Sequence, residues 1–133
     1  MEFFCPALVI GKAYDALGTK DKAQEYYGKS VTNKAVKTEH AYYQGLAHRE
    51  LGNPKKAEKV FDDLLRFAQK DLKIEPLTLE SKNLKIAENH YLAGLAYLGK
   101  NMQKKAKNEF IDVLEFNPDH VWAREYLKTL KEN

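Results

Sequence analysis

The sequence predicts an all-α fold in which antiparallel helical hairpins stack on one another. The composition, with 44% hydrophobic and 31% charged residues and only four prolines among 133 residues, is typical of a folded helical protein and excludes a disordered or fibrous one. Three segments repeat one pattern of small and aromatic residues. A glycine or an asparagine follows the first helix expected in each segment, where such residues commonly end a helix.

The repeat is found by aligning the chain with itself. Gly11 and Gly45 are 34 positions apart, and Gly45 and Gly94 are 49 positions apart, so 15 extra residues separate the second unit from the third. The spacing inside each unit is nevertheless kept. The matched positions are Gly11, Gly45 and Gly94, then Ala13, Ala47 and Ala96, then Tyr14, His48 and Tyr97, and in the second helix Ala23, Ala57 and Ala106 followed by Tyr27, Phe61 and Phe110.

Each matched position has a physical meaning. A glycine inside a helix costs about 1 kcal/mol relative to alanine, a cost that is tolerable where the missing side chain lets a neighbouring helix approach closely. The alanines of the second helices serve the same close approach. The aromatic residue four positions later lies on the same helix face, where we expect it to fill the space between hairpins.

These residues resemble the tetratricopeptide repeat family, whose units have a period of about 34 residues. The resemblance covers residues 7 to about 131 and implies a right-handed superhelical stack of three units, closed by a C-terminal capping helix. Three features depart from the family pattern. Ala35 stands where the first unit would carry its closing proline, His48 replaces an aromatic residue, and the extra residues follow the second unit.

We expect a single domain over residues 1–133 with about seven helices. The units are expected at approximately 6–36, 38–72 and 79–117, the insertion at approximately 68–83 and the capping helix at 119–131. The helices themselves are expected at approximately 6–17, 20–34, 38–51, 54–72, 79–99, 102–116 and 119–131. Thr19, Asn53 and Asp119 are the expected N-caps of the second, fourth and last helices.

The insertion contains Pro76, which excludes one continuous helix. We expect a lengthened fourth helix, a bend at Glu75-Pro76 and a lengthened fifth helix. Its apolar residues would pack where the two extensions meet, and a partner-binding lip is the alternative. These apolar residues are Leu72, Ile74, Leu77, Leu79, Leu84 and Ile86.

A narrower resemblance rests on Tyr42 to Ala47, on Phe61 to Phe67 and on Ala87 to Leu95. These segments are similar to C-terminal repeats of large bacterial proteins that carry a domain of unknown function and an N-terminal β domain like that of carbohydrate enzymes. The resemblance implies that the chain is a non-catalytic C-terminal part of such a protein.

Charge and cysteine content restrict the partners. The 22 basic and 19 acidic residues are spread along the chain, which argues against a nucleic-acid partner. No apolar run is long enough to cross a membrane, and the apolar start lacks the basic leader of a signal peptide. Cys5 is the only cysteine, so no intrachain disulfide forms. A cytoplasmic location is expected, with a secreted or periplasmic one as the alternative.

No enzyme is expected from the sequence. The four histidines, His40, His48, His90 and His120, lack the paired spacing of a metal motif, and no glycine-rich phosphate loop is present. We therefore expect no catalytic residue, no cofactor and no metal. His48 takes the place of a packing aromatic, so a structural role is expected for it.

The resemblance implies a binding surface, because first helices of the family line a concave groove. The inward positions with residue types that suit partner contacts are Lys12, Asp15, Tyr42, Arg49, Tyr91, Trp122 and Glu125. Tyrosine, tryptophan and arginine dominate binding hot spots. The alternative is that the three aromatic residues pack between hairpins.

The function expected from these features is a protein–protein interaction or scaffold module that binds a peptide or a partner domain in its concave groove. The alternative is a structural C-terminal appendage of a bacterial carbohydrate-active protein, packed on the catalytic domain of the same full-length chain. Formation of a homodimer is a third interpretation.

Overall fold

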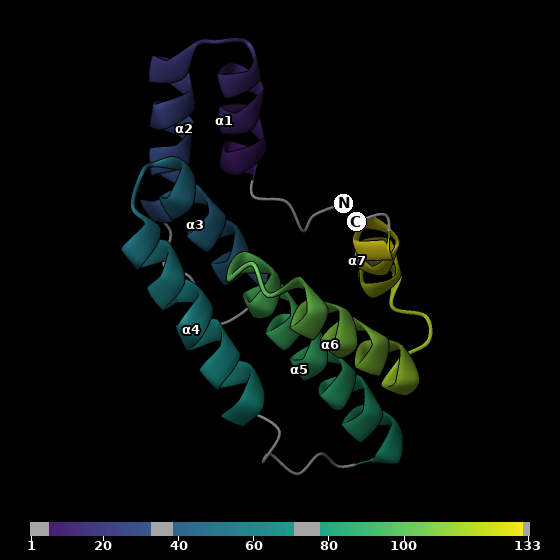
Figure 1. Cartoon of the computed structure of the whole chain (residues 1–133). Helices are drawn as coiled ribbons and strands as arrows, with labels where there is room; N and C mark the ends of the chain where they lie inside the picture. The colour runs from purple at the N-terminus through teal and green to yellow at the C-terminus, as the bar shows by residue number, and fades with distance from the viewer. Residues whose placement is uncertain (1–5, 33–38, 71–77, 132–133) are drawn as a thin grey trace. The chain divides into compact units, whose positions relative to one another are not determined.

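A computed structural model of the chain describes residues 6–32, 39–70 and 78–131. Within these ranges it contains helices and no strand (Figure 1). The helices are α1 (Pro6–Ala16), α2 (Lys20–Thr32), α3 (Glu39–Glu50), α4 (Pro54–Lys70), α5 (Leu79–Gly99), α6 (Gln103–Phe116) and α7 (Val121–Lys131). The prediction of an all-α chain of seven helices is confirmed for these ranges. No described helix is both long and apolar enough to span a membrane.

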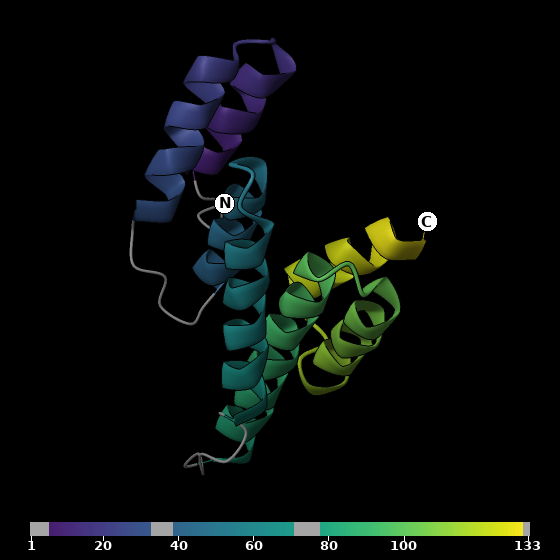
Figure 2. The ribbon, with the colours of Figure 1, turned by 60° about the vertical axis from the view of Figure 1, so that its left-hand side comes forward.

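The chain divides into two compact units, Met1–Asp63 and Leu64–Asn133. In the first unit α1 and α2 form an antiparallel hairpin, and α3 packs on α2. In the second unit α5 and α6 form a second hairpin, and α7 packs on α6 (Figure 2). The hairpins are thus the building blocks that the repeat predicted, whereas the single domain over residues 1–133 stays a prediction.

The first helix of every repeat ends in the same way. The residue after the last turn has a positive φ, which is 81° at Gly18 and Gly52 and 62° at Asn101. The next backbone N–H then donates to a carbonyl five residues earlier, as in a Schellman motif. These bonds join Thr19 to Tyr14 at 2.9 Å, Asn53 to His48 at 2.8 Å and Met102 to Tyr97 at 2.9 Å. The predicted helix ends are confirmed in all three repeats.

The helical glycines lie beneath aromatic rings of their own hairpins. A Cβ atom placed on Gly45 would lie 2.3 Å from Cε1 of Phe61, and one placed on Gly94 would lie 2.5 Å from Cε1 of Phe110. Gly11 has the same relation to Tyr27, at 2.7 Å. The predicted close approach is therefore confirmed inside each hairpin, where the aromatic ring covers the glycine. That these rings also fill the space between hairpins stays a prediction.

The insertion is described only at its two ends. Helix α4 continues to Lys70, and α5 begins at Leu79 after Thr78, whose hydroxyl accepts a hydrogen bond from the Ser81 N–H at 3.0 Å. The expected bend at Glu75-Pro76 and residues Leu72, Ile74 and Leu77 lie outside the described residues. The expected packing of Leu79 and Leu84 is wrong, because these residues are 73% and 50% exposed.

The start of α7 differs from its prediction. The helix begins at Val121, not at residue 119, and the Nδ1 atom of His120 accepts a hydrogen bond from the N–H of Ala123 at 3.2 Å. His120 thus takes the capping role expected of Asp119, whose side chain is exposed. The last helix is shorter than expected because the turn after Pro118 takes two more residues.

The close contact at Gly45 predicts the effect of adding one methyl group. Phe61 is fully buried, so its ring cannot move aside, and overpacking of this kind costs about 1–3 kcal/mol. We expect Gly45→Ala to lower the free energy of unfolding by about that amount, measured by urea denaturation.

Gly28→Ala is the matched control, because Gly28 lies in α2 and a Cβ atom there would meet nothing within 4 Å. We expect this change to stabilise the chain by about 0.5–1 kcal/mol through helix propensity. Equal effects of the two substitutions would contradict the packing account.

Candidate protein-binding surfaces

Two of the predicted groove residues meet at one aromatic ring in the first unit. The ring centroid of Tyr42 lies 6.1 Å from that of Phe61, and Cζ of Arg49 lies 5.4 Å from the same Phe61 centroid. Tyr42 is only 8% exposed. Burial raises the pKa of Tyr42 to about 12, with Tyr43 raising it further and Arg49 opposing the shift. Tyr42 therefore offers little surface to a partner, and the half-buried Arg49 offers more.

The other two predicted residues of this unit lie on α1. Lys12 is exposed, whereas Asp15 is half-buried and accepts a hydrogen bond from the hydroxyl of Tyr27 at 3.4 Å. Lys20 Nζ lies 3.6 Å from Asp15. Burial raises the pKa of Tyr27 to about 12, and the negative charges of Glu50 and Asp15 add to this effect. Asp15 thus connects α1 to α2 through its contacts with Tyr27 and Lys20.

The second unit holds the remaining three predicted residues. Tyr91 is 3% exposed, and its ring centroid lies 4.5 Å from that of His120. Trp122 is half-buried, and Glu125 is exposed with its carboxylate 3.4 Å from Lys128 Nζ. The structure thus places Tyr91 in the core between α5 and α7. That the seven residues form one partner-binding surface stays a prediction.

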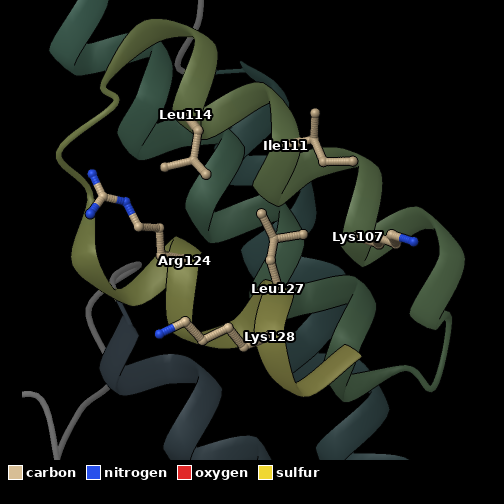
Figure 3. Close-up of a pocket in the computed structure, with 6 residues that line it drawn as sticks. All are labelled: Lys107, Ile111, Leu114, Arg124, Leu127 and Lys128. Carbon is tan, nitrogen blue, oxygen red and sulfur yellow. The ribbon is translucent and has the colours of Figure 1, made fainter. Parts of the chain in front are cut away.

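A hollow that was not predicted from the sequence lies between α6 and α7 (Figure 3). Its volume is about 330 Å³. Ile111 and Leu114 project into it from α6, and Leu127 projects from α7. Lys107 lies on one side of these apolar side chains, and Arg124 and Lys128 lie on the other (Figure 3). The hollow therefore combines an apolar floor with a cationic rim.

The packing of the two helices explains why this floor stays open. Helix α6 buries Phe110 and Val113, and α7 buries Ala123 and stacks the ring of Tyr126 on Phe110 at 5.2 Å. Ile111 lies beside this core and is 43% exposed. Helix α6 therefore carries apolar side chains in addition to those that are buried in the core.

Helix α7 differs from a capping helix with one packed face and one purely polar face. Val121 is 56% exposed although it is apolar. Arg124 and Lys128 border the apolar hollow. The available signal in the sequence was the pair Ile111 and Leu114, each directly after a core residue of α6.

His48 lies where the other two repeats carry a tyrosine, Tyr14 or Tyr97. It is half-buried like both tyrosines, and its Nδ1 atom is buried without a hydrogen-bond partner in the described part of the chain. Burial lowers the pKa of His48 from its ordinary value of 6.5, and the positive charge of Lys56 lowers it further. The neutral ring is therefore the form that fits this position.

Family models described as tetratricopeptide repeat match residues 8–36, 41–67 and 87–120. The three matched ranges correspond to the three units defined by the repeated glycine and alanine positions. Neither a curated protein nor a solved structure matches the chain.

The lowered pKa of His48 predicts a pH-dependent stability. The unfolded chain binds a proton at His48 once the pH falls below 6.5, and the folded chain binds it only at lower pH, so stability is lost as the pH falls through this window. We expect His48→Tyr to stabilise the chain more at about pH 5.5 than at about pH 7.5, measured by urea denaturation.

Tyr97→His is the converse variant, because Lys105 lies over the Tyr97 ring at 5.6 Å, as a counterpart of Lys56. It should add the same pH dependence to the second unit. Parallel stability curves for His48→Tyr and the parent chain would contradict this explanation.

Proposed function

The chain belongs to the tetratricopeptide repeat family, and from this premise we propose that it binds a protein partner in the hollow between α6 and α7. Repeats of this family generally mediate protein–protein interaction or scaffolding and are typically not catalytic. The partner that suits the hollow is an amphipathic helix with acidic residues beside its apolar stripe. The observation that carries this proposal is the apolar floor between three cationic side chains.

The apolar floor suits the side chains of a bound helix. A helix laid in such a groove presents apolar residues at positions i, i+3 or i+4, and i+7. Covering the exposed surface of Ile111 and its neighbours Leu114 and Leu127 contributes roughly 25 cal/mol for each Å² of apolar area removed from water. The floor therefore favours binding without selecting the charge of the partner.

The cationic rim selects that charge. Lys107 and Lys128 extend long flexible chains at two sides of the hollow, and Arg124 is held by the carbonyl of Pro118 and lies 3.9 Å from Asp119. Acidic groups on a partner helix would pair with the two lysines, whereas basic groups would be repelled. Charge complementarity at a rim raises the association rate and suppresses wrong partners.

Each unit also carries a smaller proposed contact surface, made of the residues predicted from the sequence. In the first unit the exposed Lys12 and the half-buried Arg49 support it, and in the second unit the exposed Glu125 and the half-buried Trp122 of α7 support it. The two tyrosines, Tyr42 and Tyr91, are buried and therefore offer little contact area to a partner.

The alternative function is a structural appendage of a bacterial carbohydrate-active protein. The helix in the hollow would then come from a neighbouring domain of the same full-length chain. This alternative rests on the sequence resemblance. A second copy of the chain is a third occupant, which sedimentation at rising concentration would detect.

A panel of three fluorescent helical peptides tests the proposal. The first has a leucine stripe flanked by glutamates, the second has lysines in place of the glutamates, and the third has serines in place of the leucines. We expect the first to bind at least about tenfold more tightly than the other two in fluorescence anisotropy, and its binding to weaken as salt is added.

Variants of the hollow complete the test. We expect Ile111→Asp to abolish binding of the acidic amphipathic peptide, and Lys107→Glu with Lys128→Glu to transfer the preference to the basic one. Lys55→Glu on α4 is the control, because Lys55 is exposed and does not line the hollow. Equal binding by the parent chain and Ile111→Asp would refute the proposed site.

A further inference from the structure

Three side chains able to bind a metal converge between α5 and α6, away from the residues that line the hollow. His90 comes from α5, and Glu109 and Asp112 come from α6. The Nδ1 atom of His90 lies 3.2 Å from a Glu109 carboxylate oxygen and 4.0 Å from one of Asp112. One donor atom from each residue lies within 4.8 Å of the other two. One imidazole nitrogen thus faces two carboxylates.

The histidine ring is held in this orientation by packing. It stacks on Phe116 with a centroid distance of 5.9 Å and an interplanar angle of 12°. The His90 and Glu109 side chains are each 22% exposed, and that of Asp112 is 44% exposed. The ligand atoms are therefore partly shielded from water and still reachable by an ion.

The charges of the group are not balanced by a basic side chain. In the described part of the chain, no lysine or arginine pairs with either Glu109 or Asp112. The two carboxylates share a partly desolvated place on the surface, and the repulsion between their negative charges is unfavourable. A divalent cation among the three side chains would relieve this repulsion.

We propose that His90, Glu109 and Asp112 bind a Zn²⁺ ion. Imidazole and carboxylate are common zinc ligands at about 2.0–2.2 Å, and two ligand atoms at that distance from one ion are roughly 3.0–3.5 Å apart. The His90–Glu109 separation already has this value, and the half-buried Asp112 side chain needs a shift of less than about 1.5 Å, because the three donor atoms lie within 4.8 Å of one another. Three protein ligands leave a fourth position for water.

Sequence spacing does not reveal this group. His90 and Glu109 are 19 positions apart on different helices, so no local motif marks them. The expectation that the chain has no metal site rested on pairs of histidines four residues apart, and this group contains a single histidine.

Calorimetric titration of the untagged chain with Zn²⁺ tests the proposal. Cys5→Ser serves as the parent, so that the thiol does not contribute to binding. We expect one Zn²⁺ per chain, and at least about tenfold weaker binding in His90→Gln and in Glu109→Gln. Co²⁺ should give a visible absorption band in the parent that both variants lack. Mg²⁺ should produce no heat, because it prefers oxygen ligands and keeps its own water.

His40→Gln is the matched control, because it removes an exposed histidine from α3. It should bind Zn²⁺ as the parent does, and circular dichroism should show that all variants keep their helices. Asp112→Asn changes the most exposed ligand, so it provides a second test of the site if His90→Gln misfolds. If the parent binds no Zn²⁺, or if His90→Gln binds it equally well, the group is a polar contact between α5 and α6 and not a metal site.

Discussion

The contact of an aromatic ring with bare helix backbone is the constraint on which the rest of this structure depends. Tyr27, Phe61 and Phe110 have 1%, 0% and 0% of their surface exposed, and each covers a glycine of the facing helix. A side chain on that glycine would force the two helices apart. The turn between the helices is then fixed by the positive φ of the residue that ends the first one. Three hairpins repeat this arrangement.

The repeated positions made most of the fold predictable from the sequence. A glycine in the first helix and an aromatic residue at a fixed offset in the second predicted the contact between them, and Gly18, Gly52 and Asn101 predicted the helix ends. Predictions failed where the chain has no repeated counterpart. Leu79 lies in the insertion. The cap of α7 could be Asp119 or His120, because both side chains can accept a hydrogen bond from a backbone N–H.

The candidate sites were harder to predict, for a physical reason. Tyrosine is a residue of both cores and binding surfaces, and only the burial of Tyr42 and Tyr91 shows how much of each ring is left for a partner. The hollow depends on which face of α7 meets α6. The group around His90 depends on the register of α5 against α6. Contacts between helices decide all three features. A single sequence does not show these contacts directly, because they form only when the helices pack together.

Helix α6 connects these features, because successive residues turn by about 100° around its axis. The stripe of α6 that faces the core contains Phe110 and Val113. Ile111, which lines the hollow, lies on one side of this stripe. Glu109 and Asp112 lie on the other side. The contact of the Phe110 ring with Gly94 therefore sets the rotation of α6 about its axis. This rotation decides where the hollow and the His90 group lie. A change that shifts this ring would alter the hollow and the His90 group together. A change at the exposed end of a lysine or of Asp112 would alter only one of them.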